Sequence, residues 1–286
     1  MTKIAILGAG SWGSALALLL AEKNNDVILW CRREEQALEI NAKHTNEQYL
    51  SGISFPKRII ATNDFSDIKQ ASTVIFATPS HYIRKIATDA VSFIPKDAIV
   101  MHVAKGIEQQ SGKFMSQILQ EILHKKSIAV LSGPNHAEEV VQHLPTATVI
   151  AAHNLSDAQQ LCTLFSTSKF KPYPLSDVRG VEICGAMKNI VALALGVCDG
   201  LKLGDNAKGS ILTLGLDEMS TVAHHFGAKK STCYGLAGIG DLVATCFSAH
   251  SRNRFVGEML AKGKSLEEIK KKMHGMIAEG VHNTKT

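Results

Sequence analysis

The sequence predicts an α/β fold in which an N-terminal doubly wound sheet is followed by an all-α C-terminal domain. Up to about residue 177, short apolar strands alternate with segments of helical periodicity, which is typical of a mostly parallel sheet covered by helices. Beyond that point the chain changes to long apolar helical segments. We therefore expect two domains, one over residues 1–177 and one over residues 178–286.

The chain opens with an apolar strand over residues 3–7, a glycine-rich turn over residues 8–13 and an apolar helix. In such a turn Gly8 permits the tight bend, Gly10 lets the backbone approach phosphates, and Gly13 lets the helix pack against the strand. The free N–H groups at the start of the helix face the bound anion. The pattern predicts a Rossmann-type dinucleotide-binding domain, and the alternative is an ordinary turn of a flavodoxin-like domain.

A second strand, over residues 26–30, indicates which dinucleotide binds. Enzymes that use NAD usually place Asp or Glu at the end of this strand, where it bonds the ribose hydroxyls. This chain has Arg32 and Arg33 there, and two guanidinium groups suit a 2′-phosphate. The alternative is that both arginines are solvated surface charges. We favour NADPH over NADH as the cofactor.

The rest of the first domain continues the alternation. Further strands are expected over residues 72–77, 98–103, 128–131 and 148–151, and a helix over residues 112–124. The carboxyl ends of such strands form the ligand-binding edge of the sheet. Lys105 follows one of them and is expected at that edge, unless it is an ordinary surface lysine. Residues 169–177 contain two prolines and are expected to be a connector.

The second domain is expected to contain helices over residues 181–198 and 210–226, and a later helix from Ser265, where Glu268 completes a capping box. The first of these is apolar nearly all round, which indicates a buried helix. Its lysine, Lys188, must therefore reach solvent at the rim of the helix or meet a partner, because burying a bare ammonium group is costly.

Asp241 is the expected partner of Lys188. It follows Gly238 and Gly240, which allow a tight bend to present the carboxylate. Glu182 cannot be the partner, since it lies six positions before the lysine and about 240° round the helix. A buried lysine has a depressed pKa, which is what proton transfer near pH 7 requires.

A short polar run at Ser251, Arg252 and Asn253 follows the Asp241 segment. Together these side chains offer a hydroxyl, a guanidinium and an amide, and Arg252 is suited to bidentate contacts with a phosphate or carboxylate. The run predicts an anion cradle, and the alternative is a polar turn ahead of a helix.

Composition excludes several other classes of protein. The 286 residues are 45% hydrophobic and carry a net charge of +5 without a cationic block, so no nucleic-acid partner is expected. The six cysteines form no C-x-x-C pair and no metal-ligand spacing, which fits a reducing cytoplasm and no metal. The first strand begins too early for a signal peptide, and we expect no apolar run of the roughly 20 residues that span a membrane. A homodimer is the expected assembly.

These segments together resemble the bacterial NAD(P)-dependent glycerol-3-phosphate dehydrogenases, over essentially the whole chain. The pairing of Lys188-Asn189 with the Gly-Asp-Leu and Ser-Arg-Asn motifs is distinctive of that family. The matching segments are residues 8–13, 105–106, 133–139, 185–189, 204–208, 238–253 and 279–281. Asn135 departs from the family, which usually has Ser or Thr there. The family also continues with further helix beyond residue 281, so we expect this chain to end short of the family's C-terminus.

The resemblance implies the roles of individual residues. Lys188 would be the general acid and base, positioned by Asp241 and Thr245, with Lys105 as a further catalytic residue. The implied substrate-binding residues are Lys105, Gly133, Asn135, Lys188, Asp241, Ser251, Arg252 and Asn253. The implied cofactor-binding residues are Gly8, Gly10, Ser11, Trp12, Gly13, Arg32, Arg33, Lys105, Ala137, Arg252, Ile277 and Glu279.

The implied reaction is reversible reduction of dihydroxyacetone phosphate by NADPH or NADH to sn-glycerol 3-phosphate, which supplies the backbone of glycerophospholipids. The partner would be a small phosphorylated substrate, without integral membrane association. Two alternatives stay open from the sequence. One is an NADP-dependent reductase of a 2-keto or 3-hydroxy acid with similar architecture, and the other is a non-catalytic protein that senses NADPH.

Overall fold

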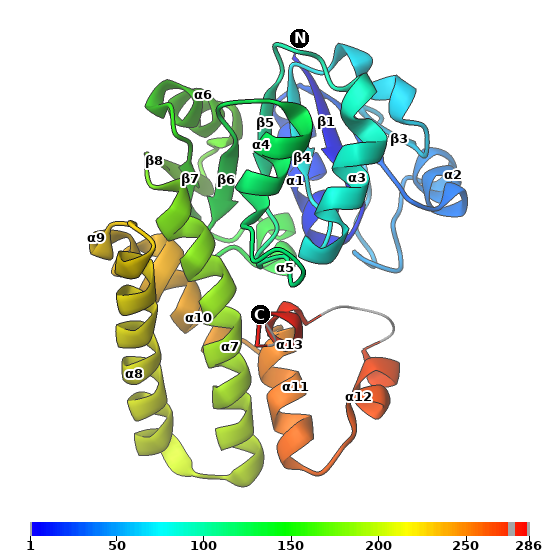
Figure 1. Cartoon of the computed structure of the whole chain (residues 1–286). Coiled ribbons are helices and arrows are strands. Elements are labelled where there is room, and N and C mark those ends of the chain that lie inside the picture. Colours follow the sequence, from blue (N-terminus) through cyan, green and yellow to red (C-terminus); the bar gives the residue numbers. More distant parts are fainter. Residues whose placement is uncertain (1, 274–277, 285–286) are drawn as a thin grey trace.

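A computed structural model describes residues 2–273 and 278–284 of the chain (Figure 1). Its sheet has eight strands in the order β3-β2-β1-β4-β5-β6-β7-β8. Neighbouring strands run parallel, except that β6 and β7 run antiparallel. The strands are β1 Lys3–Leu7, β2 Asp26–Trp30, β3 Ile59–Thr62, β4 Thr73–Phe76, β5 Ile99–His102, β6 Ala129–Ser132, β7 Thr146–Ala151 and β8 Phe170–Leu175. The predicted doubly wound, Rossmann-type sheet is confirmed.

Helices cover both faces of this sheet (Figure 1). They are α1 Ser11–Glu22, α2 Glu34–Lys43, α3 Ile83–Ala90, α4 Met115–Leu123, α5 Ala137–Val141 and α6 Leu155–Phe165, with short 3-10 turns η1 Phe65–Gln70, η2 Ser80–Tyr82 and η3 Val91–Phe93. Alternate residues of β1 enter the two cores, with Ile4 and Ile6 on the side of α1 and Ala5 and Leu7 on the side of α3. A strand buried on both faces is apolar throughout, as the sequence showed.

The expected connector over residues 169–177 is wrong, because most of it is the edge strand β8. The carbonyl oxygens of Lys169 and Leu175 accept hydrogen bonds from the β7 side at 2.8 and 3.1 Å, so odd-numbered residues face β7. Pro172 and Pro174 therefore turn the side without an N–H group outward, where no strand pairs with them. Two prolines spaced by two residues are compatible with an edge strand.

The second domain is all helical and is built around its first helix, α7 (Figure 1). Its helices are α7 Val178–Leu201, α8 Gly204–His225, α9 Lys230–Cys233, the π-helix η4 Leu236–Gly240, α10 Asp241–Phe247, α11 Arg252–Ala261, α12 Leu266–Lys272 and α13 Glu279–Asn283. α7 contacts α8, α10, α11 and α13, and also β6 of the sheet. Added Cβ atoms on Gly196 and Gly257 would overlap backbone of the opposite helix, so α7 and α11 pack backbone to backbone.

The sheet ends at Leu175, and Asp177 caps the start of α7 by accepting a hydrogen bond from the N–H of Gly180 at 3.0 Å. The capping box predicted at Ser265 and Glu268 is present at the start of α12. A division into domains at residue 177 stays a prediction.

The expectation that no apolar run reaches the length of a membrane span is wrong for α7. This helix has 24 residues and a mean hydropathy of 1.7 over its most apolar window, of which 72% is buried inside the protein. By length and composition alone it could cross a membrane, but its apolar surface lies against neighbouring helices and the sheet. Core packing accounts for this composition.

Candidate active site

The glycine-rich turn joins β1 to α1 at the carboxyl edge of the sheet. Gly8 has a φ of +125°, and a Cβ there would lie 2.7 Å from the carbonyl oxygen of Ala77. A Cβ on Gly13 would overlap the carbonyl oxygen of Gly8. At Gly10, in contrast, an added Cβ meets no atom within 4 Å, and no side chain in the described residues caps α1. The turn thus offers free backbone N–H groups in an open approach, which suits a pyrophosphate.

The two residues after Gly10 in this turn stabilise it in different ways. The hydroxyl of Ser11 donates to the carbonyl oxygen of Tyr49 at 2.9 Å, which ties α1 to the segment after α2. The ring of Trp12 packs against the core on the α1 side, and its indole nitrogen is buried without a hydrogen-bond partner in the described part of the chain.

The two arginines after β2 are exposed at the same edge. The guanidinium of Arg32 lies 5.7 Å from the centre of the Tyr82 ring, a cation–π distance, and Arg33 donates to the side-chain oxygen of Gln48. Neither arginine is sequestered in an ion pair within the described residues. Both charges thus stand where the ribose end of a dinucleotide would lie in this fold.

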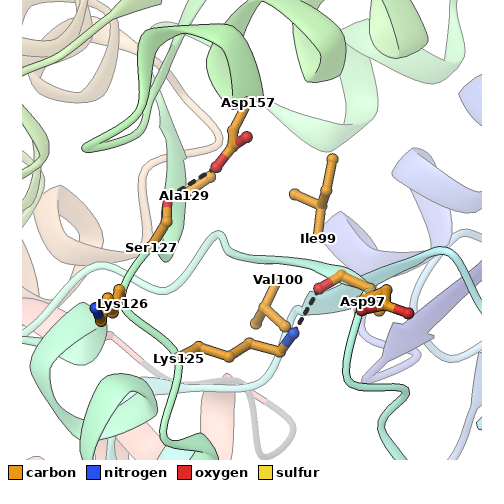
Figure 2. A pocket seen from close by; sticks show the side chains of 9 residues that line it. Asp97, Ile99, Val100, Lys125, Lys126, Ser127, Ala129 and Asp157 are labelled. Atoms are coloured by element: carbon orange, nitrogen blue, oxygen red, sulfur yellow. Dashed lines mark hydrogen bonds between the residues drawn. The ribbon is translucent and has the colours of Figure 1, made fainter.

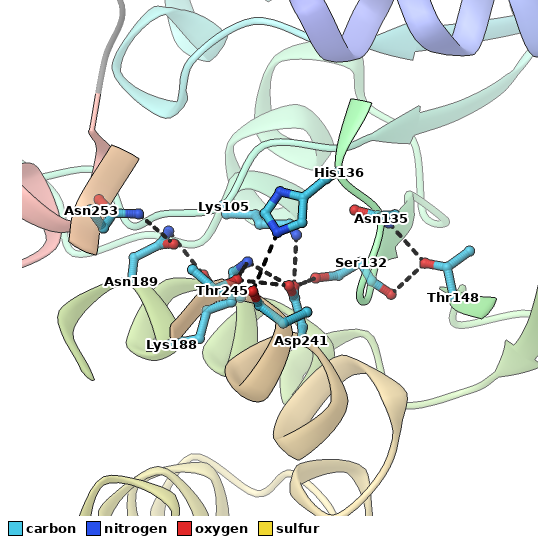
Figure 3. Close-up of polar contacts among 12 residues, drawn as sticks. Lys105, Ser132, Asn135, His136, Thr148, Lys188, Asn189, Asp241, Thr245 and Asn253 are labelled. Carbon is cyan, nitrogen blue, oxygen red and sulfur yellow. Dashed lines mark hydrogen bonds and ion pairs between the residues drawn. The ribbon is translucent and has the colours of Figure 1, made fainter. Parts of the chain in front are cut away.

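Lys188 and Asp241 are buried and form an ionic cluster with Lys105, which is partly exposed (Figure 3). The ammonium nitrogen of Lys188 lies 2.5 Å from Oδ1 of Asp241 and 2.6 Å from the hydroxyl of Thr245. The ammonium nitrogen of Lys105 lies 2.7 Å from Oδ2 of the same aspartate. The predicted pairing of Lys188 with Asp241 is therefore present in the structure.

Three separate elements supply this cluster. Lys188 comes from the middle of α7 and Lys105 from the loop after β5, while Asp241 begins α10 directly after the π-helix η4. Thr245 lies one turn beyond Asp241, so both side chains face α7. The described residues accept two of the three ammonium protons of Lys188, which leaves one donor for another group.

Burial sets the electrostatics of the cluster. It lowers the pKa of Lys188 to about 7, against the opposing attraction of Asp241 and with some help from the charge of Lys105. Burial also acts to raise the pKa of Asp241, but the two ammonium groups outweigh it and hold that pKa below its ordinary value. An ionised carboxylate thus holds a lysine that exchanges its proton near neutral pH.

The predicted anion cradle lies at the start of α11, and its three side chains differ in what they contact. Ser251 caps the helix, with its hydroxyl accepting from the N–H of Arg254 at 3.3 Å. Asn253 is buried and bridges Asn189 of α7 at 2.9 Å to the N–H of Gly280 at 2.8 Å. Arg252 is exposed.

Both neighbours of Arg252 are therefore engaged in holding the helix in place. Arg252 itself makes no hydrogen bond or ion pair with the described residues. Among Ser251, Arg252 and Asn253, Arg252 is therefore the residue whose side chain can bind a ligand without first losing a contact with the described residues.

The segment after β6 carries three further predicted residues. Gly133 packs against Thr148 of β7, and the side-chain amide of Asn135 donates to the hydroxyl of Thr148 at 2.9 Å. Figure 3 shows Asn135 directed toward β7, on the far side of the segment from Lys188. Ala137 is buried at the start of α5.

Glu279 begins α13 and reaches across to the sheet. Its carboxylate accepts hydrogen bonds from the N–H of Ser80 at 3.0 Å and from the hydroxyl of Ser80 at 2.6 Å. This contact joins the second domain to the turn after β4, at the carboxyl edge of the sheet. Ile277, the other predicted residue in this region, lies outside the described residues.

Comparison with known proteins identifies the family. Residues 3–158 match the family model of the NAD-dependent glycerol-3-phosphate dehydrogenase N-terminus, and residues 177–286 match that of its C-terminus. The chain belongs to the glycerol-3-phosphate dehydrogenase family. The resemblance seen in the sequence is thereby confirmed.

Relatives and solved structures agree with this membership. An NAD(P)-dependent glycerol-3-phosphate dehydrogenase of Chlorobium phaeobacteroides (strain BS1) is 46% identical over 287 residues, which cover 99% of this chain and 86% of the relative. One from Lysinibacillus sphaericus (strain C3-41) is 45% identical over 289 residues, covering 100% and 85%. The crystal structure of the Coxiella burnetii dehydrogenase superposes with a TM-score of 0.95 at 37% identity, covering 99% and 87%. These matches do not favour the alternative reductase or the sensor.

Two residues of this dehydrogenase that the sequence did not single out lie at the site. Ser80 binds Glu279, and His136 lies beside the Lys188 cluster (Figure 3). Ser80 directly follows the Thr78-Pro79 end of a predicted strand, a position that could have drawn attention to it. His136 lies between two residues that the family resemblance had marked, and nothing in its spacing distinguished it.

A hollow elsewhere in the dehydrogenase lies at the opposite edge of the sheet (Figure 2). Its volume is about 260 Å³, and it is lined around the amino ends of β5 and β6. The ammonium of Lys125 enters it and donates to the carbonyl oxygens of Lys96 and Ala98 at 2.6 and 2.8 Å. Since ligands of doubly wound sheets bind at the carboxyl ends of the strands, this hollow is distinct from the candidate active site.

Proposed function

We propose that the chain catalyses reversible reduction of dihydroxyacetone phosphate to sn-glycerol 3-phosphate with NADPH or NADH. The observation that carries the proposal is the buried Lys188–Asp241–Thr245 cluster, in which the described residues leave one ammonium proton of Lys188 without an acceptor. A proton donor with a pKa of about 7 matches a carbonyl reduction run near neutral pH. Family membership supplies the substrate class.

Lys188 holds the proton that the substrate oxygen takes up. As negative charge develops on that oxygen, the free N–H of Lys188 donates a hydrogen bond to it and then transfers the proton. Asp241 keeps both lysines in place and stays ionised throughout. The ammonium of Lys105 adds positive charge next to the same oxygen.

The substrate phosphate binds at the start of α11. Arg252 supplies a guanidinium that is free of other partners in the described residues, and the amino end of the helix favours an anion. Ser251 fixes where the helix begins by capping it, and Asn253 holds that end of the helix against Asn189 of α7 and Gly280. Binding energy from the phosphate then holds the carbonyl against Lys188.

The glycine-rich turn fits a dinucleotide, because Gly10 faces open space and α1 has no side-chain cap among the described residues. A nicotinamide bound there would supply the hydride. The turn holds the pyrophosphate, and Arg32 and Arg33 favour the 2′-phosphate of NADPH over the bare ribose of NADH. Glu279 orders the neighbouring turn through Ser80.

The cellular setting follows from the same chemistry. The product is the backbone of glycerophospholipids, and the six buried thiols are consistent with a cytoplasmic enzyme. We propose that the chain forms a homodimer, which is the commonest assembly among soluble oligomeric proteins.

The test is consumption of NADPH by the purified chain with dihydroxyacetone phosphate, beside NADH and beside unphosphorylated dihydroxyacetone. We expect turnover with the phosphorylated ketone and about 10- to 100-fold lower kcat/KM without the phosphate, because a charged contact is lost. Folded protein that binds NADPH without turnover, or that accepts both ketones equally, would contradict the proposal.

A further inference from the structure

His136 lies at the site without an assigned role. Its ring is half-buried at the start of α5, and Figure 3 shows it beside Lys105, over the cluster of Lys188 and Asp241. Its Nε2 lies 3.4 Å from the carbonyl oxygen of Ala244. Ala244 directly precedes Thr245, whose hydroxyl holds Lys188. The ring is therefore anchored to the turn of α10 that positions the proton donor.

The anchoring contact decides the tautomer of the ring. A carbonyl oxygen accepts hydrogen bonds and donates none, so Nε2 of His136 carries the hydrogen. In the neutral ring Nδ1 then carries a lone pair. Nδ1 has no hydrogen-bond partner among the described residues. It is also not one of their polar atoms that are fully buried without a partner, so a ligand can reach it. The ring thus offers one accessible acceptor.

Burial and the charges around His136 together favour the neutral form of the ring. Burial and the ammonium of Lys188 lower its pKa, and Lys105 acts in the same direction. The carbonyl of Ala244 and the carboxylate of Asp241 oppose them without reversing the shift. The ring of His250 faces it at 6.3 Å between centres.

Two ammonium groups thus share this site with a neutral acceptor. Lys188 and Lys105 can only donate, and Asp241 is already bound to both. Next to the two lysines, Nδ1 of His136 is therefore an acceptor that a donating substrate group can use without displacing a contact among the described residues.

The proposed substrate has one such group. Its phosphate and its carbonyl oxygen are acceptors that match Arg252 and the two lysines, whereas the free hydroxyl one carbon from the carbonyl is a donor. We propose that Nδ1 of His136 accepts a hydrogen bond from this hydroxyl, which makes His136 a specificity-determining residue. The inference rests on the proposed function, since it takes the ketone to be bound at Lys188.

The experiment compares dihydroxyacetone phosphate with hydroxyacetone phosphate, the analogue in which hydrogen replaces that hydroxyl. The wild-type chain, His136→Phe and His136→Asn are assayed with both ketones at saturating NADPH. We expect His136→Phe to lower kcat/KM for dihydroxyacetone phosphate about tenfold and to leave that for the analogue unchanged. His136→Asn keeps an acceptor oxygen near the position of Nδ1 and should restore most of the discrimination.

Controls separate this role from others. His153→Phe removes an exposed imidazole outside the cluster and should behave as wild type. Equal losses on both ketones would overturn the inference in favour of a merely structural ring. A raised KM for NADPH with unchanged discrimination would overturn it in favour of a cofactor contact. Absence of wild-type turnover with dihydroxyacetone phosphate would overturn the proposed function, and the inference with it.

Discussion

The glycine turn and the Lys188 cluster offer different kinds of groups to the ligands that we propose for them. The turn is contiguous in sequence and works through backbone N–H groups, with glycines that are either crowded, as at Gly13, or open, as at Gly10. The cluster is made of side chains from three elements, and Asp241 lies 136 positions after Lys105. The turn binds with groups that any sequence carries, whereas the cluster depends on which side chains meet. A substitution in the glycine turn should therefore leave the Lys188 cluster intact, and a substitution in the cluster should leave the turn intact.

The largest expected effect separates catalysis from cofactor binding. Lys188→Ala removes the proton donor and should lower kcat by about 100- to 10,000-fold. The glycine turn is untouched, so the Kd for NADPH, measured by fluorescence titration, should stay within about twofold. Lys126→Ala, which removes an exposed lysine, is the matched control. Turnover near the wild-type rate would remove Lys188 from the mechanism.

The reciprocal change is Gly10→Val. The backbone at Gly10 is extended, with φ −74° and ψ −179°, and an added Cβ meets no protein atom, so the fold should tolerate valine. The side chain would occupy the approach of the pyrophosphate and should raise KM for NADPH about 100-fold through lost hydrogen bonds to a charged group. Gly209→Val, also in open space, is the control. An unchanged KM would show that the pyrophosphate binds elsewhere.

A pH profile sharpens the comparison further. In the proposed mechanism, reduction requires the protonated form of Lys188, and burial lowers the pKa of this group to about 7. We expect kcat/KM for ketone reduction to be flat below that pH and to fall about tenfold per pH unit above it. Affinity for NADPH should not follow this curve. A flat rate up to pH 9 would mean that Lys188 is not the titrating donor.

The smallest expected effect concerns the choice of cofactor. Arg32→Gln and Arg33→Gln each remove one exposed charge and should raise KM for NADPH about threefold to tenfold, with little change for NADH. Lys57→Gln removes one positive charge from an exposed side chain outside the glycine-rich turn, and it controls for the change in net charge. Equal changes for both cofactors would indicate that the arginines act only through the general field of the protein.

The same contrast explains what could be predicted from the sequence. The glycine turn and most strands were predictable because apolar runs and turn residues are local signals, and β4 to β7 lie within two residues of their expected bounds. The short strand β3 was not predicted. β8 was missed because two prolines normally signal a loop, and only the outward direction of Pro172 and Pro174 makes a strand possible. That direction depends on pairing with β7, which the local sequence does not contain.

In the site, Lys188 could be singled out because a lone charge in an apolar helix demands a partner. The distribution of roles among Ser251, Arg252 and Asn253 could not, since the cap and the bridge to Asn189 depend on how α11 packs on α7. The role of His136 could not be predicted for the same reason. Its Nδ1 is an acceptor because Nε2 donates to the carbonyl oxygen of Ala244, which lies 108 residues further along the chain.

The contact of Glu279 with Ser80 has a consequence for the order in which the protein is made. The two residues are 199 positions apart, so at about 5 to 20 residues per second the ribosome completes Glu279 about 10 to 40 s after Ser80. The first strands and the glycine turn can form during that interval. The turn at Ser80 gains its carboxylate partner only when the helical domain has emerged. The carboxyl edge of the sheet therefore begins to form first, but its last contact forms at the end of synthesis.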